Sequence, residues 1–249
     1  QSLVTYVRTR LRRLGSVAMN EPAAYAVVGR TGRLAAQPAW LRDAVLAGSR
    51  LRSYEADQFT FHAGDEPGGM YGVVDGGVGI LVPSGGQDLA LCHVMRRGTW
   101  FGYGPVLSVG GRRKMTFKAV EKSHLLHLPL RELTAIGTGR PEFFRSLAAL
   151  HDMTFMMSAV RVVGDLLIRS GEKRIAAVLA RIAKREPDEA DQQPWPVRLS
   201  QADIGLMSNS SRDRVNRALA KFVKAGWITT DFKMVEVKQL SELERFALE

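Results

Sequence analysis

The sequence lacks several features that would assign it to particular protein classes. Its 249 residues include one cysteine, Cys92, which excludes a disulfide framework and suits a reducing cytosol. No apolar run approaches the roughly 20 residues that a membrane-spanning helix needs, so we expect no contact with a membrane. Long repeats and low-complexity tracts are also absent. These absences predict a globular, cytoplasmic protein.

Negative charge is scarce relative to positive charge. The chain has 35 lysines and arginines against 25 aspartates and glutamates, which gives a net charge of +10. This surplus favours a polyanionic partner, although it does not determine the fold. Hydrophobic residues make up 45% of the chain, enough to bury one large or two modest cores.

Residues 199–237 predict two short helices, a tight turn and a β-hairpin. Ser200 is placed to cap the first helix, because its hydroxyl accepts from a backbone N–H left unpaired in the first turn. Asn209 stands where that helix should end, and asparagine tolerates the left-handed backbone of a sharp turn. Ser210 or Ser211 then caps the second helix.

The second helix has two distinct faces. Its apolar residues recur at intervals of three and four, the spacing of a buried stripe: Val215, Ala218, Leu219, Phe222 and Val223. The opposite face carries Arg212, Asp213, Arg214, Asn216, Arg217 and Lys221. Polar side chains crowded into the first turns suit a helix in the major groove, where arginine pairs with guanine and aspartate with cytosine. A solvated basic surface is the alternative.

Residues 227–237 predict the hairpin. Gly226 follows the last turn of the second helix, as a helix-ending glycine does, and a turn at residues 231–233 separates two short strands. Two helices, a tight turn and a hairpin together form a winged helix-turn-helix. We therefore predict that double-stranded DNA is a partner.

This module resembles the winged helix-turn-helix of the cyclic-AMP-receptor/FNR (Crp/Fnr) superfamily of bacterial transcription regulators. The similar segments are Leu199-Ser200-Gln201, Asp203-Ile204-Gly205, residues 211–217 and Gly226-Trp227-Ile228. The resemblance implies that Arg212, Asp213 and Arg217 face bases. It also implies that Ser211, Arg214 and the N-terminus of the first helix, with Ser200 and Gln201, bind phosphates. Asn216 and Lys221 complete the expected DNA-binding set.

The preceding half of the chain predicts short strands separated by glycine turns, at a spacing of roughly eight to twelve residues. The candidate strands are residues 51–54, 58–62, 70–75, 78–82, 89–94 and 116–128, after a short helix over 38–46. Closely spaced antiparallel strands of this kind predict a β-roll or jelly roll.

Part of this region resembles the cyclic-nucleotide-binding domain of the same superfamily, through residues 61–65, 76–80, 98–102 and 113–116. In nucleotide-binding members a carboxylate binds the ribose and an arginine with a hydroxyl residue binds the phosphate. Here Tyr103 replaces the carboxylate, Lys114 the hydroxyl residue and Met115 a small residue, while Arg113 is retained. A buried hydroxyl without its acceptor costs about 1–3 kcal/mol. We therefore predict a degenerate pocket in which Tyr103, Arg112, Arg113 and Lys114 bind an unidentified anionic effector; a cyclic-nucleotide-responsive regulator is the alternative.

Other chemistries find little support in the sequence. A cupin-like β-roll enzyme with an appended DNA-binding domain, the distant alternative, needs two or three histidines converging on a metal. His124 and His127 are three residues apart, which places them on opposite faces of a strand. An FNR-type iron–sulfur sensor needs several cysteines. We therefore expect no enzymatic activity, no metal and no other cofactor, although haem held in another way stays open.

Residues 141–169 predict one long helix that begins at Pro141. Its length suits pairing with a twin helix, and folding back on its own β-roll is the alternative. Recognition helices related by a two-fold axis meet half-sites about one DNA turn apart, so homodimerisation and palindromic recognition form one hypothesis. Ser170 and Gly171 mark the hinge that follows.

The complete prediction is an α+β chain of four segments. These are a basic N-terminal extension (1–35), a cyclic-nucleotide-binding-like β-roll or jelly roll (36–140), a dimerisation helix (141–169) and a winged helix-turn-helix DNA-binding domain (170–249). The extension has six arginines and one acidic residue and is expected to pack on the β-roll or to be mobile. We predict a cytoplasmic, homodimeric transcription regulator that binds double-stranded DNA, with RNA polymerase as a further partner.

Overall fold

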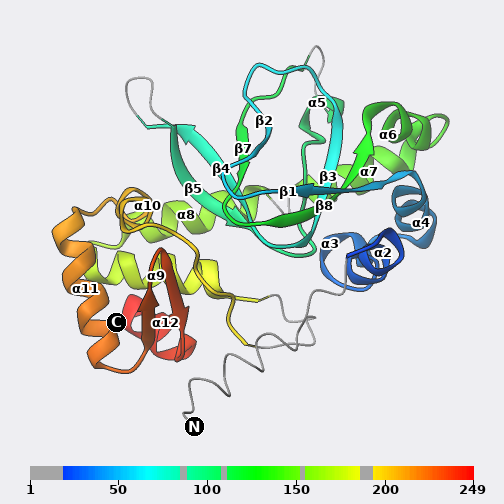
Figure 1. The fold of residues 1–249 in the computed structure, drawn as a ribbon. Coiled ribbons are helices and arrows are strands. Elements are labelled where there is room, and N and C mark those ends of the chain that lie inside the picture. Colours follow the sequence, from blue (N-terminus) through cyan, green and yellow to red (C-terminus); the bar gives the residue numbers. More distant parts are fainter. Residues whose placement is uncertain (1–18, 85–88, 108–110, 152–154, 186–192) are drawn as a thin grey trace, which may run out of the picture.

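The computed structural model describes residues 19–84, 89–107, 111–151, 155–185 and 193–249. Figure 1 shows a β-roll flanked by small N-terminal helices on one side and by a C-terminal domain of helices and a hairpin on the other. This is the mixed α+β architecture that the sequence predicts. Most of the predicted N-terminal extension, residues 1–18, lies outside the described residues.

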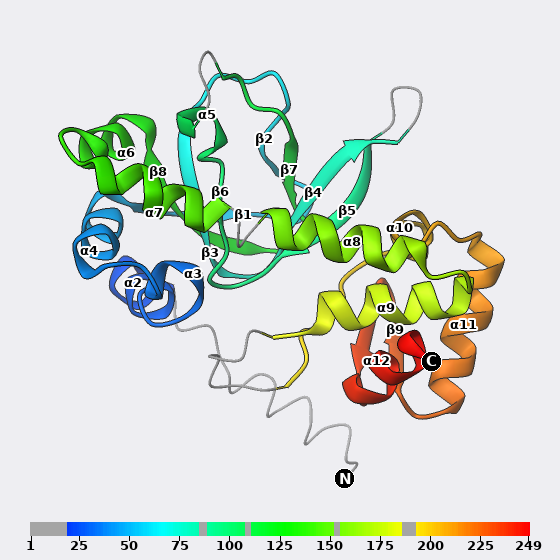
Figure 2. The same cartoon turned by 180° about the vertical axis from the view of Figure 1, so that it is seen from behind.

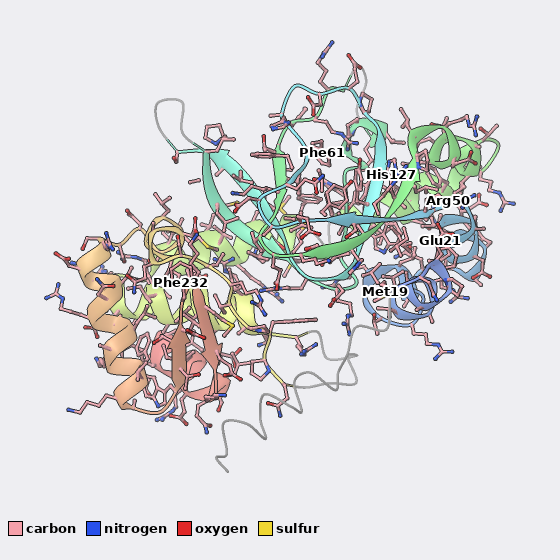
Figure 3. The ribbon with its side chains drawn as sticks, in the orientation of Figure 1. Met19, Glu21, Arg50, Phe61, His127 and Phe232 are labelled. Carbon is pink, nitrogen blue, oxygen red and sulfur yellow. The ribbon has the colours of Figure 1, made fainter. Side chains whose placement is uncertain are left out.

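The N-terminal helices pack on the β-roll. They are α2 (Glu21–Val28), α3 (Gly32–Ala35) and α4 (Ala39–Gly48). Asn20 caps α2 by accepting from the amide of Ala23 at 3.0 Å. Glu21 accepts from the amide of Leu51 at 3.1 Å, so α2 is tied to the first strand; Figure 3 shows Glu21 near Arg50 at this edge. The described part of the extension, from residue 19, therefore belongs to the β-roll core.

The β-roll consists of two four-stranded antiparallel sheets. One has the order β1-β8-β3-β6 and the other β2-β7-β4-β5. The strands are β1 (Arg50–Tyr54), β2 (Phe59–Phe61), β3 (Gly69–Asp75), β4 (Val78–Pro83), β5 (Leu89–Met95), β6 (Trp100–Phe101), β7 (Thr116–Ala119) and β8 (Ser123–Pro129). Gly72 lies opposite Trp100, and a Cβ at this glycine would be 2.6 Å from the indole ring, which explains the need for glycine there.

The predicted strand 116–128 is two strands in different sheets. Residues 120–122 carry the chain from β7 to β8, where Ser123 Oγ accepts from the amide of Gly77 at 3.0 Å. Both strands share β-forming residues without an intervening glycine or proline, so the sequence pattern did not mark the crossing. The short elements β6, α5 (Gly104–Leu107) and α6 (Leu130–Gly137) were also missed.

The predicted long helix comprises two helices with different surroundings. The first, α7 (Pro141–His151), buries Phe143, Leu147 and Leu150 against the N-terminal helices and the β-roll. The second, α8 (Met157–Leu167), has no buried residue. Residues 155 and 156, just before α8, have π-helical backbone, and Figure 2 shows the two helices following each other along the molecule. Only α8 therefore offers an uncovered surface of the kind expected of a dimerisation helix.

The C-terminal domain is built around α9 (Gly171–Ala183), whose apolar face is buried. Around it lie α10 (Gln201–Met207), α11 (Arg212–Lys224), β9 (Ile228–Asp231), β10 (Met234–Val237) and α12 (Leu240–Leu248). One detail of the sequence prediction is wrong, because Val223 is 42% exposed rather than buried. Ser170 occupies the N-cap position of α9 without a side-chain cap hydrogen bond.

Candidate DNA-binding surface and effector pocket

Local interactions fix both the start of α10 and the turn between α10 and α11. Ser200 Oγ accepts from the amide of Asp203 at 3.1 Å, and the Asp203 carboxylate accepts from the amide of Ser200 at 3.1 Å, which forms a complete capping box. Asn209 has φ 45°, the left-handed backbone expected at this position. A Cβ on Gly205 would lie 2.9 Å from the carbonyl oxygen of Ser210, so glycine permits the close approach of the turn.

Helix α11 presents one face to the protein and the other to solvent. Ser211 caps it by accepting from the amide of Arg214 at 3.4 Å. Four of the five predicted apolar residues are buried: Val215, Ala218, Leu219 and Phe222. Figure 1 shows α11 along the outer edge of the C-terminal domain. The polar face of the helix is therefore open to a large partner.

All the predicted DNA-binding residues except Ser200 are exposed. Five of them form an open group on this surface: Gln201, Arg212, Asp213, Asn216 and Arg217. Within the part of the chain that the structure describes, their side chains make no hydrogen bond or ion pair. Their donors and acceptors are thus available to bases and phosphates without the loss of an internal contact.

Two other predicted residues point from α11 toward the start of α9. Arg214 lies over Gly171, where a Cβ would be 2.3 Å from the Arg214 Cδ. Lys221 Nζ forms an ion pair with Glu172 at 2.7 Å and lies 4.9 Å from the centre of the Phe246 ring. A phosphate contact by Lys221 therefore requires this ion pair to open. The hydroxyls of Ser200 and Ser211 are likewise already engaged as helix caps.

The structure reveals a positioning residue, Arg174, that sequence reasoning missed. Its guanidinium donates to the carbonyl oxygens of Ser208 at 2.6 Å and Asn209 at 2.9 Å, in the turn before α11. It also donates to those of Ile168 at 2.8 Å and Arg169 at 3.1 Å, in the hinge after α8. One side chain thus joins the hinge to the helix-turn-helix. No local pattern indicates this role, because the acceptors in the turn are backbone atoms more than 30 positions away.

The wing is present, with its tip directed toward the β-roll. Phe232 at the tip is 86% exposed, and Figure 3 labels it at the end of the hairpin. Lys233 has φ 51°, as the tight turn requires. Phe232, Lys233 and Asp57 of the β-roll line the same open cavity of about 720 Å³. Lys233 and the hydrogen-bonded Lys118 both help to lower the pKa of Asp57, with Lys118 as the larger influence.

The predicted effector pocket corresponds to a cavity of about 280 Å³ at one end of the β-roll. The rings of Phe61, Phe117 and Phe155 form much of its wall, together with Met115. Its described lining contains Arg112, Arg113 and Lys114 but no aspartate or glutamate. The cavity therefore combines an apolar wall with three cations, and its described lining lacks an acceptor of the kind that a ribose hydroxyl needs.

Arg113 is held by the protein itself. It is 4% exposed, and its guanidinium donates to the carbonyl oxygens of Gly69, at 2.9 Å, and of Gly102. The guanidinium carbon lies 4.0 Å from the centre of the Phe61 ring. Desolvation lowers the pKa of Arg113 from its ordinary value. Its buried Nε has no partner among the described residues, whereas each terminal nitrogen already donates one N–H to a backbone carbonyl, so part of the fork that could bind a phosphate is occupied.

The other predicted effector residues are placed differently. Tyr103 is fully buried and packs edge-on against His151 and Phe155, with ring centres 5.9 and 6.2 Å away, and it does not line the cavity. Tyr103 was predicted to line the pocket only because it stands at the position where nucleotide-binding members of the superfamily have the ribose-binding carboxylate. Arg112 is exposed and pairs with Glu66 at 2.6 Å, and Lys114 is exposed at the mouth.

The described residues offer neither a metal site nor a membrane-spanning helix. Among them, no group of three histidine, cysteine, aspartate or glutamate side chains is arranged to hold a metal ion. None of the described helices is both long enough and apolar enough to cross a bilayer.

Both halves of the chain match known protein families. The model of the cyclic nucleotide-binding domain matches residues 51–139, and that of the Crp-like helix-turn-helix domain matches residues 173–246. The cAMP-activated global transcriptional regulator CRP of Pasteurella multocida is 22% identical over 175 residues, which cover 70% of this chain and 83% of that protein. Regulatory protein HlyX of Actinobacillus pleuropneumoniae is 20% identical and covers 78% of this chain and 80% of its own length.

Solved structures show the same fold. A CRP-family transcriptional regulator from Thermus thermophilus is 20% identical, with a TM-score of 0.61 over 80% of this chain and 97% of that one. FixK2 from Bradyrhizobium japonicum is 18% identical, with a TM-score of 0.63 over 80% and 96%. The proteins from Pasteurella multocida and Thermus thermophilus are both described as transcriptional regulators. The chain belongs to the Crp/Fnr superfamily of transcription regulators, with a cyclic-nucleotide-binding domain followed by a Crp-like helix-turn-helix domain.

Proposed function

We propose that this regulator binds a palindromic DNA site as a homodimer, with α11 of each protomer in the major groove. The observation that carries this proposal is the exposed polar face of α11. Arg212, Asp213, Asn216 and Arg217 have no internal partner among the described residues, so they enter a groove without breaking a contact. Arginine and aspartate there match the donors and acceptors of guanine and cytosine.

The proposed dimer forms through α8. Its large apolar residues are exposed, with Val160 at 56%, Val163 at 55% and Leu167 at 75%. Leu166 is exposed as well, at 43%. An apolar helix with no buried residue is costly in water and is typical of an interface. A second copy of α8 would cover this strip and set the distance between the two recognition helices.

Two contacts would pass movements of α8 to the DNA-binding surface. Asp165 of α8 forms an ion pair with Arg181 of α9 at 2.7 Å, and both side chains are largely buried. Arg174 of the same α9 holds the turn that precedes α11. A displacement of α8 would therefore move α9 and α11 together, which would change the spacing of the paired recognition helices.

We further propose that the effector pocket has lost the ordinary recognition of cyclic nucleotides. The described lining offers no carboxylate for a ribose, and both terminal nitrogens of Arg113 already donate to the carbonyl oxygens of Gly69 and Gly102. An anion with an apolar body fits the pocket better than a cyclic nucleotide does, because Arg112 and Lys114 lie at the mouth of a cavity whose wall is largely aromatic. Calorimetric titration with cyclic AMP and cyclic GMP tests this idea. Saturable heat with either one at micromolar concentrations would contradict it.

The DNA proposal is tested by Arg217→Ala. Sites would first be selected from random oligonucleotides, and affinity would then be measured on the selected site and on random DNA. We expect Arg217→Ala to weaken the selected site by about 1–3 kcal/mol and to relax discrimination at one base pair. The control is Arg131→Ala on α6, whose side chain is 90% exposed and lies in the β-roll domain. Equal losses on selected and random DNA would remove Arg217 from the base-reading set.

The dimer proposal is tested by Leu167→Glu and sedimentation. Leu248→Glu is a matched control, because Leu248 is 86% exposed at the end of α12, outside α8. The first variant should sediment as a monomer and bind a half-site without cooperativity, while the control stays dimeric. A dimer that survives Leu167→Glu unchanged would show that α8 is not the interface.

A further inference from the structure

A second cavity, of about 210 Å³, lies where the β-roll meets α8 and α9. Its wall is formed by the turn between β5 and β6, by both helices, by Trp195 and by the start of α3. Of its described lining residues, seven are arginine or lysine and none is aspartate or glutamate. Arg96 and Arg97 come from the β-roll, Arg161 from α8, and Arg181 and Lys184 from α9 and its end. Figure 2 shows α8 and α9 running side by side next to the β-roll.

Some of this charge is balanced by carboxylates that lie outside the lining. Asp165 pairs with Arg181, Asp75 with Arg97 at 3.4 Å, and Glu244 with Lys184 at 2.7 Å. Glu121 is shared between Arg96 and Arg198, the latter at 2.8 Å. Arg161 has no hydrogen bond or ion pair among the described residues. Four of the seven cations thus have carboxylate partners, and none of these carboxylates is among the described lining residues.

Arg181, which lines this space, retains an unused donor. Its side chain is 5% exposed; Nε donates to Asp165, and Nη1 donates to His93 Nδ1 at 2.7 Å. Nη2 is buried and has no partner among the described residues. A buried guanidinium N–H without an acceptor is unfavourable, so this position is suited to an oxygen of a bound anion.

The lowered pKa of His93 reflects the positive potential of the same site. Desolvation, followed by the nearby charges of Arg181, Arg161 and Arg96, lowers its pKa to about 3. Because arginine only donates, Nδ1 of His93 must accept, which requires the neutral ring. The histidine therefore adds no charge of its own, and it orients Arg181.

Trp195 holds the arginines in place. The guanidinium carbon of Arg185 lies 3.7 Å from the centre of an indole ring, and those of Arg97 and Arg96 lie 5.3 and 5.6 Å from it. Stacking of this kind restricts long side chains before a ligand arrives. It also links the segment after α9, which carries Trp195, to the β5–β6 turn.

We propose that this cavity is a second effector site, which binds a diphosphate group and fixes the β-roll against α8 and α9. Several guanidinium groups converging on one space match the multiple charged oxygens of a phosphate chain. The volume corresponds to about seven water molecules at about 30 Å³ each, enough for two phosphate groups and too little for a nucleic acid strand. The arginines that would bind the diphosphate come from both sides of the hinge. Binding would therefore restrict the movement of the DNA-binding domain relative to the β-roll.

The test uses the full chain without DNA at low ionic strength. It would be titrated with inorganic pyrophosphate, with ADP and with sulfate at matched ionic strength, by calorimetry and tryptophan fluorescence. We expect saturable binding of pyrophosphate and ADP but not of sulfate, with a fluorescence change that Trp195→Phe abolishes. Equal affinities for pyrophosphate and ADP would show that the diphosphate group alone is recognised. Tighter binding of ADP than of pyrophosphate would show that the nucleoside adds contacts outside the cavity. Both results would support the site.

Arginine variants decide whether the binding is local. Arg161→Gln and Arg97→Gln should each weaken pyrophosphate about tenfold, the loss expected for one charge-assisted contact. Arg131→Gln, at an exposed position on α6, should leave it unchanged. Sedimentation and thermal melts would verify that the variants keep their fold and oligomeric state. No saturable binding, equal affinity for sulfate, or equal losses in all three variants would overturn the proposal.

Discussion

Replacing Arg174 by methionine should uncouple the helix-turn-helix from the hinge. Methionine retains the apolar part of the side chain and removes all four hydrogen bonds to Ser208, Asn209, Ile168 and Arg169. The bonds to Ser208 and Ile168 are partly buried, whereas the other two are exposed. Water replaces the exposed bonds at little cost, so the partly buried pair determines the size of the effect.

The expected loss of stability is about 2 kcal/mol. A hydrogen bond from a charged donor contributes about 1.5–3 kcal/mol, so two partly buried bonds contribute about 3–4 kcal/mol after allowance for exposure. Release of the ordered arginine side chain returns up to about 2 kcal/mol of conformational entropy. Arg174→Lys should recover less than half of the loss, because one ammonium group does not reach both the hinge and the turn.

Urea unfolding of the full chain would measure this loss, with Lys173→Met as the control at the neighbouring position. DNA affinity should fall together with stability, because the turn that Arg174 holds sets the direction of α11. An Arg174→Met variant within about 0.5 kcal/mol of the wild type, with unchanged affinity for DNA, would refute the reasoning.

Two further predictions concern the hinge and the domain junction. Gly171→Ala should displace Arg214, because the new Cβ would lie 2.3 Å from the Cδ of Arg214. The affinity for DNA should therefore fall several-fold in a gel-shift assay. The control Ser170→Ala should have little effect, because the Ser170 side chain makes no cap hydrogen bond. The pKa of His93 is about 3 in the folded chain and 6.5 without perturbation, so the unfolded chain takes up the proton first. Stability should therefore decline as the pH falls from about 6.5 toward 3, by up to about 1.4 kcal/mol per pH unit from this group, and His93→Gln should reduce that slope in urea titrations.

The DNA-binding module was predictable because local rules determine it. The capping box at Ser200, the left-handed Asn209 and the apolar spacing in α11 each depend on residues within one or two turns. The β-roll followed from glycine turns and alternation, which also act locally. The prediction of the β-roll fails where the chain passes from one sheet to the other, as at residues 120–122, because a crossing without glycine or proline leaves no local signal.

The sites were less predictable because they depend on distant contacts. The position of Tyr103 along the chain suggested a pocket residue, yet packing against His151 and Phe155 places it in the core. The ion pair of Lys221 with Glu172 gave no signal either, because the two residues lie 49 positions apart. The cationic cavity unites residues from Arg33 to Trp195, and no spacing rule connects positions so far apart.

The bare apolar strip on α8 has a consequence for how such a regulator would respond to its own abundance. If only paired chains grip both half-sites, the population of pairs rises with the square of the copy number while single chains predominate. Promoter occupancy would then switch on over a narrow range of synthesis rates. Modest changes in expression or proteolysis would therefore regulate promoter occupancy directly, in addition to any small-molecule effector.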